Sequence, residues 1–225
     1  MRLHSSLGRM PRLTIEHDAA DVAVTATTRR RSIALRLDGV AWLRVEPEAL
    51  GELGVCNGDE IDDARRAAVE MALARVRARL FVVRSLAVKM QSAAEIERKL
   101  AARDVPADVA REAIERVAGY GYLDDAALAG QLARGMQSRG YGRRRAEAKL
   151  RARGLRGEDA ENALDEAYAE QDETALARKA LGRRSLVDDA DRRRASAFLA
   201  RRGFSARAAW KAIQEAREDP PPGAV

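Results

Sequence analysis

Residues 149–168 read KLRARGLRGEDAENALDEAY, and the same pattern returns as KLAARDVPADVAREAIERVA at 99–118 and as FLARRGFSARAAWKAIQEAR at 198–217. The three segments align without a gap, and leucine occupies the second position of each. Past a short turn, apolar residues recur at i, i+3, i+4 and i+7, which places one face of a helix against a core. The chain is therefore predicted to repeat a helix, a turn and a second helix three times.

A further helix is expected ahead of each pair. The three candidates are Ala64 to about Gln91, Asp124 to about Ser138, and Asp172 to about Arg184. Ser92 and Glu95 have the spacing of a capping box, and Gly154 and Gly203 stand where a helix can end with a positive φ. Each repeat is then a three-helix module. Because one module buries little apolar surface, neighbouring modules are expected to share interfaces in an elongated, curved array.

The N-terminal third has a different pattern, rich in β-branched and alternating residues. The runs on either side of the turn dipeptide Asp38-Gly39 predict a β-hairpin over Ser32–Val45, and the β-branched residues at 22–28 favour a further strand before it. Short strands of this kind are not stable alone in water. They are therefore expected to pack on the following helices, through Leu50, Leu53 and Val55.

The sequence thus predicts a mainly α fold, with tandem three-helix repeats and a small N-terminal β-hairpin region. Hydrophobic residues make up 46% of the chain and aromatic residues only 4%, so small and aliphatic side chains must form the core, which favours helices. The expected parts are a flexible tail at 1–12, a β-containing region at 13–63, three-helix repeats at 64–122, 123–171 and 172–218, and a second flexible tail at 219–225.

The charge of the chain favours a polyanionic partner. Its 225 residues carry a formal net charge of +6. Most of the basic residues are arginine, which forms bidentate contacts with phosphate and carboxylate. A nucleic acid or an acidic protein is the expected partner, and a solvated arginine-rich surface is the alternative.

Other classes of protein are disfavoured. Cys56 is the only cysteine, and the two histidines, His4 and His17, lack ligand-like spacing, so no disulfide, metal or other cofactor is expected. No apolar run approaches the roughly 20 residues that span a bilayer, so a soluble, cytoplasmic protein without a membrane partner is predicted. No nucleophile stands beside a base and no glycine-rich phosphate loop follows a strand, so catalytic residues and enzymatic activity are not expected.

The chain has two glycine–tyrosine–glycine turns, at 119–121 and 140–142, and the densest basic run surrounds the second. Its members, with the tyrosine of that turn, are Arg139, Tyr141, Arg143, Arg144, Arg145, Lys149, Arg151 and Arg153. Several phosphate contacts would give binding with a steep salt dependence. From Gly157 to Glu173 the charge reverses, with eight acidic residues and no basic one. A protein already coating nucleic acid would suit both faces, and intramolecular ion pairs are the alternative.

Four residues ahead of this run are possible partner contacts. Tyr120 and Tyr122 offer rings that stack on bases or anchor a protein surface, and packing beside the glycine turn is the alternative. Asp124 and Asp125 begin a helix, where capping of N–H groups is the expected role and partner contact the alternative. At the start of the helix from Ala64, four acids are expected to complement the exposed N–H groups and the helix dipole, and metal binding is the alternative; they are Asp59, Glu60, Asp62 and Asp63.

Several motifs together resemble the RecX family, regulators of the RecA recombinase. The resemblance rests on GYGYLDD at 119–125, RGYGRRR at 139–145 and KLRARGL at 149–155. It covers about Ile33 to Arg217. The chain departs from the family at Arg143, where proline is frequent, and at Leu128, where an aromatic residue is usual. Both departures leave the order and spacing of the motifs intact.

The resemblance implies a non-enzymatic regulator that binds RecA, as the monomer and as the nucleoprotein filament, along the filament groove on DNA. It implies limited filament growth and inhibition of recombinase, ATPase and SOS coprotease activities, with effects on homologous recombination, DNA repair and the SOS response. The basic run would touch acidic RecA surface or single- and double-stranded DNA, without sequence preference. The alternative is a transcriptional regulator with helix-turn-helix-like modules, which the scarcity of Asn and Gln in the expected groove helices counts against.

Overall fold

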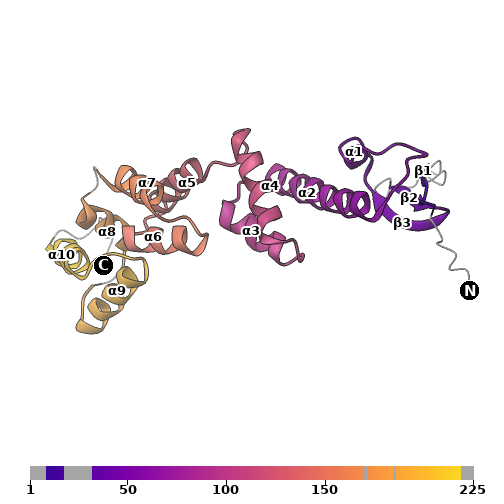
Figure 1. The fold of residues 1–225 in the computed structure, drawn as a ribbon. Helices are drawn as coiled ribbons and strands as arrows, with labels where there is room; N and C mark the ends of the chain where they lie inside the picture. Colours follow the sequence, from indigo (N-terminus) through magenta and orange to yellow (C-terminus); the bar gives the residue numbers. More distant parts are fainter. Residues whose placement is uncertain (1–8, 18–31, 170–171, 185, 219–225) are drawn as a thin grey trace, which may run out of the picture. The chain divides into compact units, whose positions relative to one another are not determined.

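The computed structural model describes residues 9–17, 32–169, 172–184 and 186–218, and Figure 1 shows their helices and strands. The chain divides into two units. The N-terminal unit is Met1–Arg84 with Leu100–Val117, and the C-terminal unit is Ser85–Lys99 with Ala118–Val225. The predicted strand residues at 22–28 and most of both predicted tails lie outside the described residues.

Three antiparallel strands form the sheet of the N-terminal unit, in the order β1–β2–β3. They are β1 (Leu13–His17), β2 (Ile33–Leu37) and β3 (Val40–Val45). Asp38 and Gly39 join β2 to β3 with positive φ values of 48° and 80°, the backbone that a two-residue hairpin turn requires. The predicted hairpin is therefore confirmed, and β1 pairs with β2 as a third strand.

The sheet packs on α1 (Pro47–Leu50), on α2 (Asp63–Val88) and on the segment between them. The buried core includes Leu13, Leu35 and Val45 of the sheet, Leu53 and Val55 of the connecting segment, and Val69, Leu73 and Val76 of α2. Leu50 is partly buried against the same core. The predicted packing through these side chains is confirmed, and the burial of their apolar surface stabilises strands that are too short to persist alone.

Eight more helices follow α2 in the described part of the chain. They are α3 (Ala93–Ala101), α4 (Ala107–Gly119), α5 (Asp125–Ser138), α6 (Arg143–Ala152), α7 (Glu158–Tyr168), α8 (Glu173–Leu181), α9 (Asp189–Arg201) and α10 (Ala206–Glu218). The predicted helix–turn–helix pairs are α3–α4, α6–α7 and α9–α10, and a further helix precedes each pair. At the start of α2, the Asp62 carboxylate accepts the Arg65 N–H at 2.6 Å, so one of the four acids expected to complement this helix end caps it.

The three helix-to-helix turns share one backbone geometry. The residue with positive φ is Asp104, Gly154 or Gly203, at 57°, 82° and 86°. The N–H of the following residue donates to the carbonyl of Leu100, Leu150 or Leu199, at 3.2, 3.0 and 3.1 Å. These three leucines occupy the same position in the aligned repeats and all are buried. The repeat predicted from the sequence is therefore also a structural repeat, because its three turns share this hydrogen bond.

Two apolar clusters form the core of the C-terminal unit. One joins α5, α6 and α7 through Leu128, Leu150 and Leu164, and the other joins α8, α9 and α10 around Leu199 and Ile213. Buried alanines fill much of the remaining space, so the helices approach closely. The predicted mainly α fold with tandem three-helix repeats is confirmed. In the ranges that the structure describes, no helix is both long and apolar enough to cross a membrane.

Candidate polyanion-binding site

Inside the C-terminal unit, the turn that ends α6 docks on the first turn of α3. The Ser92 hydroxyl donates to the Arg153 carbonyl at 2.5 Å, and Gly154 lies directly against Ala94. Ser92 and Glu95 also form the predicted capping box, because each backbone N–H donates to the other side chain, at 3.0 and 3.1 Å. We call this set of interactions the α3 contact.

Arg153 is the central side chain of the α3 contact. Its Nε and Nη2 donate to the two carboxylate oxygens of Glu95 at 3.0 and 2.5 Å, and Nη2 also donates to the Met90 carbonyl at 3.1 Å. The two side chains are 18% and 21% exposed. The bond from Arg153 holds the pKa of Glu95 below its ordinary value, although burial opposes this effect. Arg153, expected from the sequence to touch a partner, is thus bonded within the C-terminal unit.

The two aspartates at the start of α5 are both used in capping. Asp124 is the N-cap of α5, and its carboxylate accepts the Ala127 N–H at 2.8 Å, as predicted. Asp125 instead accepts the Ala93 N–H at 3.1 Å, so it caps α3 rather than its own helix. Burial raises the pKa of Asp125, while the bond from Ala93 acts in the opposite direction. Sequence spacing could not reveal this bond, because it joins residues 32 positions apart.

A second docking repeats the first one module further along the chain. The Gly142 N–H donates to the Arg202 carbonyl at 2.9 Å, and Arg202 Nη1 donates to the carbonyls of Arg139 and Gly140 at 3.0 Å each. The backbones of Gly142 and Gly203 touch, with no room for a Cβ on either residue. We call this set the α6 contact, because the turn after α9 docks on the start of α6.

Tyr141 packs at the α6 contact. The Arg202 guanidinium lies 4.9 Å from the centre of the Tyr141 ring, and the Tyr141 carbonyl accepts the Tyr168 hydroxyl at 2.9 Å. Burial raises the pKa of Tyr168 to about 12, so this hydroxyl remains a donor at neutral pH. By contrast, Tyr120 and Tyr122 are 63% and 69% exposed, on the turn before α5, and their partner role stays a prediction.

Ion pairs on the surface involve part of the basic run. Arg143 pairs with Asp165 of α7 at 2.6 Å, and Arg151 pairs with Glu147 one turn away. Arg134 pairs with Glu166 of α7 at 3.5 Å. Intramolecular ion pairs were the alternative that the sequence left open for the acidic segment, and they exist for Asp165 and Glu166 of α7. All these side chains are well exposed, so each pair contributes at most about 1 kcal/mol and can exchange for another partner.

The rest of the basic run faces solvent without a partner. Arg139, Arg144, Arg145 and Lys149 are exposed, and within the described residues their side chains make no ion pair or hydrogen bond. Arg144 and Arg145 line a groove of about 620 Å³ between α6, α9 and α10, together with Arg201 of α9. The other described lining residues are small or apolar and none is acidic. Three guanidinium groups therefore share one open groove without a neutralising carboxylate.

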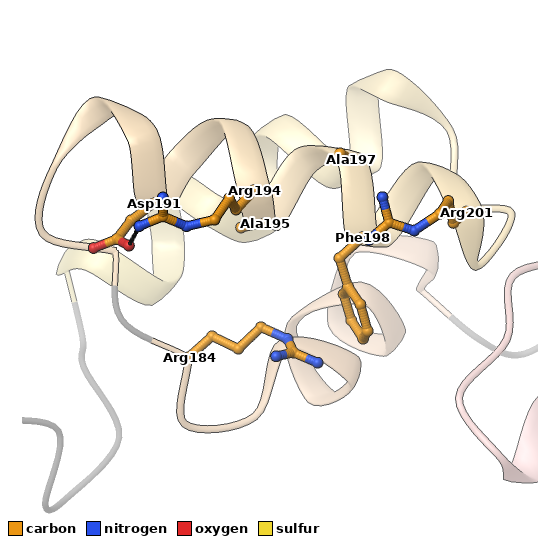
Figure 2. A pocket seen from close by; sticks show the side chains of 7 residues that line it. All are labelled: Arg184, Asp191, Arg194, Ala195, Ala197, Phe198 and Arg201. Carbon is orange, nitrogen blue, oxygen red and sulfur yellow. Dashed lines mark hydrogen bonds and ion pairs between the residues drawn. The ribbon is translucent and has the colours of Figure 1, made fainter.

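Arg201 extends this basic surface across α9, and sequence reasoning missed it. It also lines a second groove, on the Arg184, Arg194 and Phe198 side of the helix (Figure 2). There, the Arg184 guanidinium lies 3.8 Å from the centre of the Phe198 ring. The aligned repeats do contain a signal for Arg201, because alanine occupies its position in the other two, at Ala102 and Ala152.

The arrangement has the properties of a binding surface. The grooves are open and basic, and α7 presents exposed acids such as Glu158 and Glu161. Within the described ranges, no group of three or more His, Cys, Asp and Glu side chains is placed to hold a metal ion. The arrangement suits an extended, charged partner rather than a small molecule.

Two solved structures of similar fold cover 92% and 64% of this chain. A structure described as that of the regulatory protein RecX is 22% identical, covers 92% of this chain and all of its own, and has a TM-score of 0.64. The structure of RecX from Lactobacillus salivarius is also 22% identical, covers 64% of this chain and 97% of its own, and has a TM-score of 0.53. At this identity the two structures show a shared fold.

Sequence comparisons identify the family. The model of the first three-helix domain of RecX matches residues 78–116, and that of the second matches residues 124–164. The regulatory protein RecX of Xanthomonas campestris pv. campestris (strain B100) is 38% identical over 112 residues, which are 49% of this chain and 69% of that protein. RecX of Stenotrophomonas maltophilia (strain R551-3) is 37% identical over the same length and coverage. The chain therefore belongs to the RecX family of regulatory proteins.

Proposed function

We propose that this chain binds the RecA recombinase, as the monomer and as the filament on DNA, and inhibits its recombinase, ATPase and SOS coprotease activities. The observation that supports the proposal most is the basic groove of Arg144, Arg145 and Arg201. The chain that carries this groove belongs to the RecX family of regulatory proteins. A RecA filament on DNA is a protein-coated polyanion, which offers phosphate and acidic side chains to such a groove. Under this proposal the chain acts in the cytoplasm, where RecA binds DNA.

The charged residues divide into four roles under this proposal. Arg144, Arg145 and Lys149 contact phosphate or acidic side chains directly, since they are exposed and make no side-chain bond among the described residues. Arg143 and Arg151 exchange their surface ion pairs for partner contacts at small cost. Arg153 holds α6 against α3 and positions the others. Exposed acids of α7, such as Glu158 and Glu161, face basic filament surface.

Reversing the charge of the groove tests the proposal. The double substitution Arg144→Glu, Arg145→Glu is expected to weaken binding to RecA filaments at least tenfold at low salt, because it replaces two attractive contacts by repulsive ones. Binding is measured by co-sedimentation with filaments assembled on single-stranded DNA. The matched control is Arg98→Glu, Arg111→Glu, which reverses two exposed arginines outside the groove and should bind nearly normally.

The outcomes are distinct. Equal binding by the groove variant and the wild-type chain would remove the groove from the function. Equal loss in both variants would show that net charge, not the groove, determines binding. A footprint on one preferred duplex sequence, with no effect on RecA, would favour a helix-turn-helix regulator instead.

A further inference from the structure

We propose that the groove between α6, α9 and α10 binds one strand of single-stranded nucleic acid, with phosphates on Arg144, Arg145 and Arg201 and a base stacked on Trp210. This inference rests on the proposed function and deepens it, because it names the ligand of the same groove and adds Trp210 from the third module. It requires no RecA, so it is tested separately.

Trp210 is a large apolar side chain that the fold does not use. It is 66% exposed, while Ala209, Ala212 and Ile213 beside it on α10 are buried. A tryptophan in water on a helix surface contributes little to stability and exposes a wide aromatic face. Exposed aromatic residues next to basic grooves are the usual platforms on which single strands stack their bases.

Trp210 lies one helical turn beyond Ala206, a residue that lines the groove. Ala209 of α10 also lines the groove, and Trp210 lies on the same side of the helix as Ala206. Side chains of a helix tilt toward its N-terminus, so the indole leans back over the turn that carries Ala206. Arg207, exposed in that same turn, adds another positive charge beside the ring.

The chemistry of the groove favours a single strand over an acidic protein or a duplex. Arginine charges attract all three polyanions, but an exposed indole gains stacking energy only from a base that is free to leave its neighbours. The bases of a duplex are already stacked. The floor of the groove is made of small residues, including Ala148, Ser196 and Ala200, so a backbone can approach the guanidinium groups closely.

Tryptophan fluorescence can measure this binding directly. The chain contains two tryptophans. The indole N–H of Trp42, in the N-terminal unit, donates a hydrogen bond to the Glu70 carboxylate. In a Trp42→Phe chain, Trp210 is therefore the only tryptophan and reports on its own surroundings. Titration with a dT oligonucleotide should quench its emission. The logarithm of the association constant should fall with the logarithm of salt concentration with a slope of about −2, from three phosphate contacts.

Two substitutions separate stacking from charge. Trp210→Ala, measured with a labelled oligonucleotide, should bind about 5- to 150-fold more weakly with an unchanged salt slope, while Trp210→Phe should retain much of the affinity. Arg201→Ala should reduce the magnitude of the slope by about 0.7, whereas Arg111→Ala should not change it. Circular dichroism confirms that each variant is folded.

Three results would overturn the inference. They are an emission of Trp210 that the oligonucleotide does not change, a Trp210→Ala chain that binds as tightly as wild type, and tighter binding to duplex than to single strand. Failure here leaves the proposed function standing if the chain still acts on RecA filaments. Conversely, binding to free single strands without any effect on RecA would support this inference and contradict the proposed function.

Discussion

Replacing Gly142 by alanine is expected to destabilise the C-terminal unit by about 2–4 kcal/mol, because a methyl group has no space at the α6 contact. A Cβ at this position would lie 2.6 Å from the Gly203 carbonyl carbon and 2.8 Å from the Phe204 nitrogen. Both atoms are backbone, so relief requires α6 and α9 to separate. The φ of Gly142 is −74°, so backbone strain is not involved, and loss of the glycine N-cap accounts for at most about 1 kcal/mol.

Gly135→Ala is the matched control. Gly135 lies inside α5, and a Cβ there would have no neighbour within 4 Å. Alanine should therefore stabilise the chain by about 0.5–1 kcal/mol, through its higher helix propensity. Urea unfolding followed by circular dichroism gives both values. Opposite signs for the two variants would support close docking of the two turns, whereas equal effects would show that Gly142 and Gly203 do not touch in solution.

Replacing Arg153 by alanine is expected to cost about 2–3 kcal/mol, although the residue belongs to a basic run that is otherwise largely exposed. The substitution removes a bidentate pair with Glu95 and a bond to the Met90 carbonyl, and among the described residues it leaves the partly buried Glu95 carboxylate with only the Ser92 N–H as a donor. Arg151→Ala is the control, because its pair with Glu147 is exposed and contributes about 0.3–0.5 kcal/mol. A loss no larger than that of the control would contradict the α3 contact.

The pH dependence of the Arg153 effect has a definite sign. The pKa of Glu95 is lower in the folded chain than its ordinary value of 4.5, so the ionised carboxylate stabilises the fold. This contribution is complete above pH 4.5 and is lost as the pH falls through the lowered pKa. The difference in stability between the wild-type and Arg153→Ala chains should therefore shrink as the pH falls below about 4. Asp125 is present in both chains, so its opposite shift largely cancels. A difference in stability that did not change with pH would show that Arg153 does not lower the pKa of Glu95.

Local patterns were sufficient to predict the hairpin and the helices of the repeats, but not the short helix α1 or the bounds of β1. The capping box of Ser92 and Glu95, the hairpin turn at Asp38 and the positive φ of Gly154 and Gly203 are all properties of a few neighbouring residues. The threefold repeat added evidence from distant parts of the chain, because the pattern in each segment supported the helices predicted for the other two. Asp104 shows the limit of that rule, since it adopts the same positive φ without being glycine.

The candidate site was predicted less completely, because a sequence does not show which charges meet. Arg153 belongs to the same basic run as Arg144, yet Glu95, 58 positions earlier, binds it inside the unit. Asp125 was expected to cap its own helix and caps α3. Arg201 lies one module away in the sequence and lines the groove with Arg144 because the turn after α9 docks on α6.

The most direct test of the central claim is a titration of the wild-type chain into preformed RecA filaments on single-stranded DNA, with filament length and ATP turnover measured together. The account predicts that filaments shorten and ATP turnover falls at amounts below one chain per RecA subunit, and that the Arg144→Glu, Arg145→Glu variant needs at least tenfold more protein for the same effect. Filaments of unchanged length and unchanged ATP turnover, at amounts up to one chain per RecA subunit, would contradict it.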